Sequence, residues 1–273
     1  MRYERIELSK ENENVYLEAY IADPIKAFVR KAILILPGGG YYKISERESA
    51  PIAQAFMPYG YNAFVLHYSV GKESGKKFPD QLIEATLAIK HIKDHAEEYG
   101  IDSEELFAVG FSAGGHLAGT LGTLWKSEEV NAAVADMPCG YNKLKGVMLI
   151  YPMISPDYSN NEKYITAWES LCDCKITDKE KLHRASVERH VDADSTPAFI
   201  VHGFNDKTVD LRNSLALGNA YAEAGVPFEL HVYPNAPHGF SLANAITANG
   251  KPKYELPVVA EWLRMAAEWA ETL

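Results

Sequence analysis

The chain has 273 residues, of which 47% are hydrophobic, enough to bury the core of one large α/β domain or two small ones. Its formal net charge of −10 argues against nucleic acid or an anionic membrane surface as a partner. The N-terminus carries no apolar run of a signal peptide, and no segment approaches the roughly 18 apolar residues of a membrane span. We therefore expect a cytoplasmic protein. No linker, repeat or low-complexity tract divides residues 1–273, which predicts a single domain.

The first part of the chain alternates between strand and helix patterns. Strands at 6–8 and 15–21, joined by the polar turn at 11–14, predict an antiparallel hairpin at a sheet edge. The run at 32–36 has the continuous apolar character of a fully buried strand. The elements expected next are a helix over 50–59, a strand over 63–67 and an amphipathic helix over 79–99.

A triple glycine follows the first buried strand, in the run Pro37-Gly38-Gly39-Gly40-Tyr41. Glycine lets backbone N–H groups approach a bound molecule with no side chain in the way. Standing alone, this run favours a flexible turn. Beside a nucleophile it would instead supply the donors that stabilise the oxyanion of an acyl-transfer intermediate.

The most informative segment lies near the middle, where an apolar strand at 106–110 runs into Gly110-Phe-Ser112-Ala-Gly114 and then a helix over 113–125. This Gly-x-Ser-x-Gly pattern is typical of a nucleophile elbow, a sharp strand-to-helix turn that lifts a serine hydroxyl above a parallel sheet. The turn also aims the free N–H groups of the following helix at the reacting atom. A lone match is weak, because a glycine-rich strand-to-helix loop is common in α/β proteins.

Two later loops carry the partners that such a serine needs. Asp206 follows a strand over 198–202, and His238 follows a strand over 228–233. Open α/β sheets gather ligands at the carboxyl ends of their strands, so we expect the three side chains to meet there. The order Ser, Asp, His along the chain is that of α/β-hydrolases and differs from the orders in chymotrypsin-like and subtilisin-like proteases.

The remaining elements complete the alternation, apart from one insertion. A strand at 147–151, a helix at 211–224 and a C-terminal helix at 256–270 predict a mainly parallel, eight-stranded sheet with helices on both faces. The insertion at 152–197 has helical patches at 163–172 and 179–186 and is longer than a simple crossover. We interpret it as a small cap over the serine, since long connections in compact domains are usually functional. The alternative is a longer connection that packs on the sheet.

At these motifs the chain resembles the small α/β-hydrolase esterases with a His-Gly-Gly-Gly oxyanion loop, in particular their short acetyl-esterase or xylan-esterase-like relatives. The resemblance extends from about Ala32 to the C-terminal helix. One departure is Pro37, which replaces the usual histidine and weakens any link to the hormone-sensitive-lipase branch. That histidine shapes the loop, so we expect catalysis to be intact. The matching segments are Pro37-Gly38-Gly39-Gly40-Tyr41, Gly110-Phe-Ser112-Ala-Gly114-Gly115-His116, His202-Gly203-x-x-Asp206 and Pro237-His238-Gly239-Phe240.

The resemblance implies a serine carboxylesterase acting on short acyl esters, such as acetyl groups on a carbohydrate, with no metal or cofactor. It implies Ser112, His238 and Asp206 as the catalytic triad. The backbone donors of the oxyanion hole would be those of Gly39, Gly40 and Ala113. The expected partner is a small ester or acetylated oligosaccharide, and a homodimer is one option for assembly. Residues considered as substrate contacts are Tyr41, Tyr42 and Trp168.

Other residues compete for these roles. Asp210 is close to Asp206, but Asp206 follows its strand sooner and matches the family pattern. His116 lies one helical turn past Ser112 and is interpreted as a buried hydrogen-bonding residue, while His202 would brace its loop. The pair Cys172 and Cys174 has no histidine or further cysteine at ligand spacing, so we interpret both as incidental thiols.

Several other functions fit the same pattern. A peptidase of the prolyl-oligopeptidase type, a thioesterase and an arylformamide hydrolase share the fold, although a peptidase needs binding elements for which this chain has little room. An inactive ligand-binding protein of this fold is a different class, because fold does not determine function. Such proteins typically lack the serine or the histidine, and this chain has both.

Overall fold

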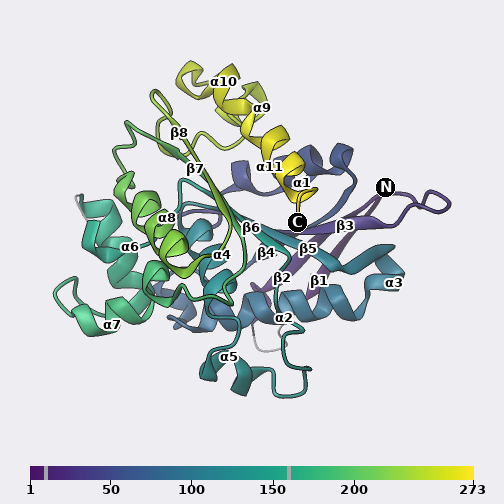
Figure 1. Ribbon diagram of the computed structural model, residues 1–273, viewed down its shortest axis with the longest axis horizontal. Helices are drawn as coiled ribbons and strands as arrows, with labels where there is room; N and C mark the ends of the chain where they lie inside the picture. The colour runs from purple at the N-terminus through teal and green to yellow at the C-terminus, as the bar shows by residue number, and fades with distance from the viewer. Residues whose placement is uncertain (9–11, 159–160) are drawn as a thin grey trace.

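The computed structural model describes residues 1–8, 12–158 and 161–273, and its strands form one eight-stranded sheet (Figure 1). The strand order is β1-β2-β4-β3-β5-β6-β7-β8. β1 (Arg2–Glu7) pairs antiparallel with β2 (Tyr16–Ile21), which pairs antiparallel with β4 (Tyr61–His67). The other strands run parallel to their neighbours and are β3 (Arg30–Leu36), β5 (Ile101–Phe111), β6 (Gly146–Ile150), β7 (Ala198–Gly203) and β8 (Phe228–Tyr233). The predicted fold class and the edge hairpin are thus confirmed, while Glu11 in its turn lies outside the described residues.

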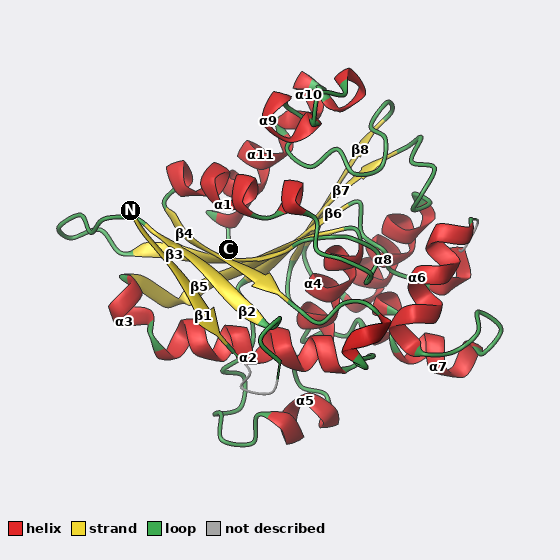
Figure 2. Cartoon of the chain, turned by 180° about the vertical axis from the view of Figure 1, so that it is seen from behind, coloured by secondary structure: helices red, strands yellow, loops and turns green. Residues whose placement is uncertain are grey.

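Both faces of the sheet are covered by helices, and alternate residues of each central strand explain why. In β3, Leu34 and Leu36 belong to one buried cluster, whereas Ile33 and Ile35 belong to the other. Successive side chains of a strand point to opposite faces, so a strand apolar at every position is stable only between two layers. Figure 2 shows the two layers on opposite sides of the sheet. One layer contains α1 (Ala50–Phe56) and α11 (Trp262–Ala270), and the other contains α2 (Asp80–Asp94), α4 (Ala113–Thr123) and α8 (Arg212–Ala224).

Some element boundaries differ from those predicted. The helix expected over 79–99 is interrupted at His95, whose backbone leaves the helical region, so that α2 is followed by the short α3 (Ala96–Tyr99). β5 begins at Ile101, before the predicted 106. The residues that follow Ile101, from Asp102 to Glu105, are polar and at least partly exposed, so they conceal the apolar strand pattern. The C-terminal helix is divided into α10 (Pro257–Ala260) and α11. Two short helices, α5 (Glu128–Ala133) and α9 (Ala245–Ala248), were not predicted.

The insertion at 152–197 contains α6 (Glu162–Cys172) and α7 (Lys179–Arg184), close to the predicted helical patches. Both lie at one side of the molecule, beyond α8 (Figure 1). The Tyr164 hydroxyl of α6 lies 2.6 Å from Asn213 Oδ1 of α8, and the Leu171 carbonyl accepts a hydrogen bond from Phe78 N–H. The insertion is therefore anchored at both ends of α6. Single turns of 3-10 helix are η1 (Glu46–Glu48), η2 (Met57–Tyr59), η3 (Lys72–Ser74), η4 (Pro156–Tyr158), η5 (Val187–His190) and η6 (Pro252–Tyr254).

The parallel arrangement brings four loops to one edge of the sheet. β3 and β5 are hydrogen-bonded neighbours, as are β7 and β8. Because parallel strands end at the same edge, the loops after these four strands lie together there. Those loops carry Gly38–Gly40, Ser112, Asp206 and His238. Within the described ranges, no helix combines the length and apolar character needed to cross a bilayer.

Candidate active site

Ser112 occupies a strained turn between β5 and α4. Its φ of 54° and ψ of −114° are rare for a residue with a side chain, and such strain persists only where the surroundings impose it. The glycines on either side leave no room for a side chain. A Cβ at Gly110 would lie 2.1 Å from the Gly114 carbonyl oxygen, and one at Gly114 would lie 1.9 Å from the Leu36 carbonyl oxygen. The Gly-x-Ser-x-Gly spacing is therefore what allows β3, β5 and α4 to pack this closely.

Three side chains from separate loops form a continuous hydrogen-bonded chain at this turn. Ser112 Oγ lies 2.9 Å from His238 Nε2, and His238 Nδ1 lies 2.7 Å from Asp206 Oδ2. An ionised carboxylate can only accept, so Nδ1 carries the proton and Nε2 is left to accept the serine O–H. This tautomer is the one that a general base needs in order to take the serine proton.

Asp206 is held by more than its histidine. Its Oδ1 accepts hydrogen bonds from the backbone N–H groups of Thr208 and Val209, at 2.8 and 2.9 Å. Burial by itself raises the pKa of Asp206, but the hydrogen bond and charge of His238, together with the backbone donors, outweigh it and lower the pKa. The carboxylate is therefore ionised and aimed at His238.

The two competing residues near Asp206 have other partners. Asp210 forms a bidentate pair with the Arg212 guanidinium, with both contacts at 2.9 Å. His202 is fully buried, donates from Nε2 to the Val209 carbonyl and accepts at Nδ1 from the Ser214 hydroxyl. The structure thus brings Asp206 to His238 and assigns His202 to bracing the loop, as expected from the sequence.

The glycine loop and the start of α4 contain backbone N–H groups that have no partner within the described part of the chain. Gly38 packs beside the nucleophile, since a Cβ built on it would lie 3.1 Å from Ser112 Cβ. Within the described part of the chain, the N–H groups of Gly39, Gly40 and Ala113 have no hydrogen-bond acceptor in the protein. Ala113 is the first residue of α4, where an N–H has no partner inside the helix. Their donor capacity is therefore unused by the described residues.

Of the three residues considered as substrate contacts, two lie in the interior. Tyr41 and Trp168 are 3% and 0% exposed, whereas Tyr42 is 41% exposed. The Tyr41 hydroxyl donates to His116 Nδ1 at 2.7 Å, and the Trp168 ring meets the His116 ring edge-on, with centroids 5.2 Å apart. These contacts join the glycine loop, α4 and α6, and they give Tyr41 and Trp168 a packing role.

His116 is the centre of that junction and is held neutral. Its Nε2 lies 2.6 Å from the Ala185 carbonyl, which can only accept, so Nδ1 is the acceptor for Tyr41. Burial lowers the pKa of His116 to about 4. The sequence-based interpretation of His116 as a buried hydrogen-bonding residue agrees with this geometry.

We expect this histidine to make folding stability depend on pH. The unfolded chain binds the His116 proton near pH 6.5 and the folded chain only near 4, so the unfolded state holds more protons in between. Lowering the pH from 7 to 4 should therefore remove up to about 3 kcal/mol from the free energy of unfolding. Urea unfolding at several pH values, for the wild type and His116→Gln, measures the effect. His202 is present in both proteins, so its titration cancels in the comparison. If the free energy of unfolding had the same slope against pH in both proteins, the prediction would be contradicted.

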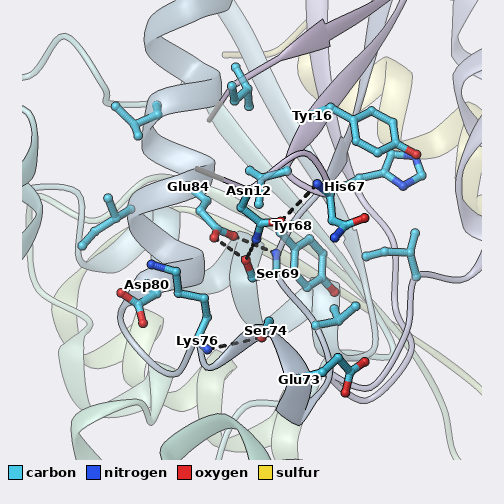
Figure 3. Close-up of a pocket in the computed structure, with 17 residues that line it drawn as sticks. Asn12, Tyr16, His67, Tyr68, Ser69, Glu73, Ser74, Lys76, Asp80 and Glu84 are labelled. Atoms are coloured by element: carbon cyan, nitrogen blue, oxygen red, sulfur yellow. Dashed lines mark hydrogen bonds between the residues drawn. The ribbon is translucent and has the colours of Figure 1, made fainter. Parts of the chain in front are cut away.

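A separate cleft of about 810 Å³ lies between the start of β2 and α2 (Figure 3). Ser112, His238 and Asp206 do not line this cleft. The ring of Tyr16 is stacked on His67 at 4.1 Å between centroids, and the Arg5 guanidinium covers its other face at 3.8 Å. Glu84 accepts a hydrogen bond from Ser69 N–H at 2.8 Å. The cleft therefore offers neither the nucleophile nor an open face of Tyr16 for stacking.

The cysteines show no reactive arrangement. Burial raises the pKa of Cys172 to about 12, which keeps its thiol protonated and weakly nucleophilic. Cys139, Cys172 and Cys174 are all free thiols. In the described ranges, no group of three or more His, Cys, Asp or Glu side chains is placed to hold a metal ion.

Three further residues contact these loops and were not singled out in the sequence. Arg47 and Glu48 lie in η1, just after the glycine loop, and Tyr151 follows β6. Glu48 is a charged residue only 5% exposed, and Tyr151 has a positive φ of 41°. A charged pair on a loop carries no periodic signal, so only their contacts reveal them.

Comparison with known families identifies the relatives of this chain. The profile of a family described as BD-FAE matches residues 17–221, and that of the dienelactone hydrolase family matches residues 182–267. Endo-1,4-beta-xylanase B of Butyrivibrio fibrisolvens is 32% identical over 217 residues, which is 79% of this chain and 33% of that protein. An acetylxylan esterase of Xylanibacter ruminicola is 27% identical over 77% of this chain and 41% of its own length. The chain thus spans a third to two fifths of these two relatives.

Solved structures of similar proteins match over nearly their whole length. MGS-M1, an alpha/beta hydrolase enzyme from a Medee basin deep-sea metagenome library, is 31% identical with a TM-score of 0.79, covering 100% of this chain and 97% of that one. An acetyl ester-xyloside bifunctional hydrolase from Caldicellulosiruptor lactoaceticus is 28% identical with a TM-score of 0.80, covering 99% and 96%. These matches confirm the α/β-hydrolase fold and the predicted resemblance.

Proposed function

Because this chain belongs to the BD-FAE family, we propose that it is a serine carboxylesterase that hydrolyses short-chain acyl esters. The observation that carries the proposal is the hydrogen-bonded chain from Ser112 through His238 to Asp206, beside free N–H groups of the glycine loop. The relatives that are named as an acetylxylan esterase and an acetyl ester-xyloside hydrolase support an ester substrate.

In the proposed first step, Ser112 Oγ attacks the ester carbonyl while His238 Nε2 takes its proton. Asp206 keeps His238 in the required tautomer and stabilises its positive charge. The N–H groups of Gly39, Gly40 and Ala113 bind the oxyanion of the tetrahedral intermediate. Each such donor is worth on the order of 3 kcal/mol in enzymes where one has been removed.

The second half of the reaction repeats this sequence with water. His238 first gives its proton to the departing alcohol, leaving the acyl group on Ser112. Water then attacks the acyl-enzyme, with His238 as the base, and releases the carboxylic acid. Atoms balance with one water consumed and one alcohol and one acid formed. Every proton moves between His238 and oxygen atoms of serine, substrate and water.

We propose an acetyl group on a carbohydrate as the natural acyl ester. The support is the names of the relatives, two of which contain acetyl and xylan or xyloside. In this proposal the insertion at 152–197 acts as a small cap that limits access to Ser112, and Tyr42, the exposed tyrosine of the glycine loop, contacts the substrate. The cytoplasmic location, the homodimer and the single-domain organisation of residues 1–273 stay predictions.

We expect hydrolysis to be confined to short acyl chains. The test is a series of p-nitrophenyl esters from acetate to octanoate, followed by measurement of acetate released from acetylated xylo-oligosaccharides. The Ser112→Ala protein serves as the control throughout. Strong acetate activity that falls steeply by octanoate, together with acetate release from the sugars, would support a carbohydrate esterase.

Other outcomes of the same series would redirect the assignment. Activity on p-nitrophenyl acetate without release from the sugars would support a small esterase and contradict the carbohydrate substrate. Hydrolysis of amides or thioesters alone would support the hypothesis of a peptidase, a formamidase or a thioesterase. Failure of Ser112 to react with a fluorophosphonate would favour an inactive ligand-binding protein.

A further inference from the structure

The pair Arg47 and Glu48 lies next to the glycine loop. It contacts both the glycine loop and the loop that carries His238. Glu48, in η1, is 5% exposed, and its two carboxylate oxygens accept two hydrogen bonds. Oε2 accepts from Gly38 N–H at 2.9 Å, at the start of the glycine loop. Oε1 accepts from the Tyr151 hydroxyl at 2.7 Å. A buried carboxylate is costly unless its hydrogen bonds are satisfied, and here they tie two loops together.

Tyr151 also contacts His238. Its ring meets the His238 ring edge-on, with centroids 5.0 Å apart, and its hydroxyl accepts a hydrogen bond from Ser241 N–H at 3.1 Å. The residue is fully buried and has a φ of 41°, a backbone conformation that is strained for a bulky residue. The strain is offset by contacts that fix the ring against His238.

Arg47, the neighbour of Glu48, binds the loop that carries His238. Its Nη2 donates to the Gly239 carbonyl at 2.9 Å, next to His238, and its Nε donates to the Thr247 carbonyl. The Arg47 carbonyl in turn accepts from the Ser241 hydroxyl at 2.8 Å. Two successive residues of one turn therefore bind the glycine loop and the loop of His238, which lie about 200 residues apart in the sequence.

We propose that Arg47 and Glu48 form a positioning clip, which sets the glycine loop in register with His238. The proposal rests on the proposed function, because it concerns the same ester hydrolysis. The oxyanion donors must reach the carbonyl oxygen while the general base reaches the hydroxyl of Ser112 that attacks the carbonyl carbon, and a displacement near 1 Å can cost about 100-fold in rate. Neither residue touches the reacting atoms. Each acts through a loop, Glu48 mainly on the oxyanion donors and Arg47 on His238.

The central test is Glu48→Ala, compared with Glu84→Ala as a matched control. Glu84 is a second, partly buried carboxylate with a backbone N–H donor, and it lines the cleft of Figure 3, which Ser112, His238 and Asp206 do not line. We expect Glu48→Ala to lower kcat about 10- to 100-fold with KM within about 2-fold, less than removal of a whole oxyanion donor. Glu84→Ala should keep the wild-type kcat per folded molecule.

A transition-state readout separates positioning from general loosening. A trifluoromethyl ketone adds to the nucleophilic serine and places an oxyanion in the donor site, so its affinity should fall by the same factor as kcat in Glu48→Ala. Glu48→Gln retains one acceptor for Gly38 N–H and should recover most of the activity. Arg47→Ala should lower kcat by about 10-fold while KM stays unchanged.

Wild-type kcat and inhibitor affinity in Glu48→Ala would overturn the clip, and so would an equal loss of kcat in Glu84→Ala. If Glu48→Ala does not fold, Glu48→Gln and Arg47→Ala are measured, and wild-type kcat in Arg47→Ala would overturn the clip. Failure of the proposed function is a different result, in which the wild type shows no activity that depends on Ser112.

Discussion

Replacement of Ser112 by alanine is expected to abolish ester hydrolysis and leave the fold intact. The loss in kcat should be at least about 10⁴-fold, because the nucleophile acts as a unit with its base. The turn should survive because backbone bonds hold it. Ser112 N–H donates to the Ile150 carbonyl at 3.0 Å, and its carbonyl accepts from the N–H groups of His116 and Met153. Turnover of p-nitrophenyl acetate, with circular dichroism and thermal unfolding, measures both parts.

The control for Ser112→Ala is active-site labelling. A fluorophosphonate should modify the wild type once and leave Ser112→Ala unlabelled. A small residual rate above that of water is expected, since the N–H donors still bind the substrate oxygen. Wild-type-like turnover by Ser112→Ala would contradict the proposed mechanism.

Replacement of Asp206 by asparagine is expected to lower kcat by about 10⁴-fold with little change in structure, the loss known for such a change in another serine hydrolase. The contacts of Asp206 explain why. Thr208 and Val209 present N–H donors to one oxygen of the side chain, so the asparagine oxygen must take that position. Its NH₂ group then faces His238 Nδ1, which becomes the acceptor, and Nε2 carries the proton. In that tautomer His238 cannot take the proton of Ser112.

The matched control is Asp210→Asn, four residues away. Asp210 pairs with Arg212 at the surface, and a surface ion pair contributes at most about 1 kcal/mol. We expect kcat of Asp210→Asn to stay within about 2-fold of the wild type. A large loss in Asp210→Asn with little loss in Asp206→Asn would move the acid to Asp210. The comparison uses kcat from the same ester and the folded fraction from unfolding curves.

Much of the fold could be predicted because its signals are local. Buried parallel strands are short apolar runs bounded by glycine or polar loops, and Ile33 to Leu36 shows this pattern without knowledge of its neighbours. The predicted boundaries were wrong where polar residues interrupt the apolar pattern of β5 and where the helix breaks at His95. The short helix α5 buries one apolar side chain, Val130, which is too few for a periodic signal.

The sequence by itself determined the α/β-hydrolase class, the glycine loop and the order of Ser112, Asp206 and His238, because each motif is a local strand-to-loop pattern. The sequence already favoured Asp206 over Asp210 as the carboxylate, and the tertiary structure places Asp206 Oδ2 2.7 Å from His238 Nδ1. Only the tertiary structure decided that Tyr41 and Trp168 pack in the interior around His116, and that Arg47 and Glu48 join two distant loops. These choices depend on contacts between residues as many as 200 positions apart in the sequence. No local pattern of apolar or glycine residues encodes such contacts.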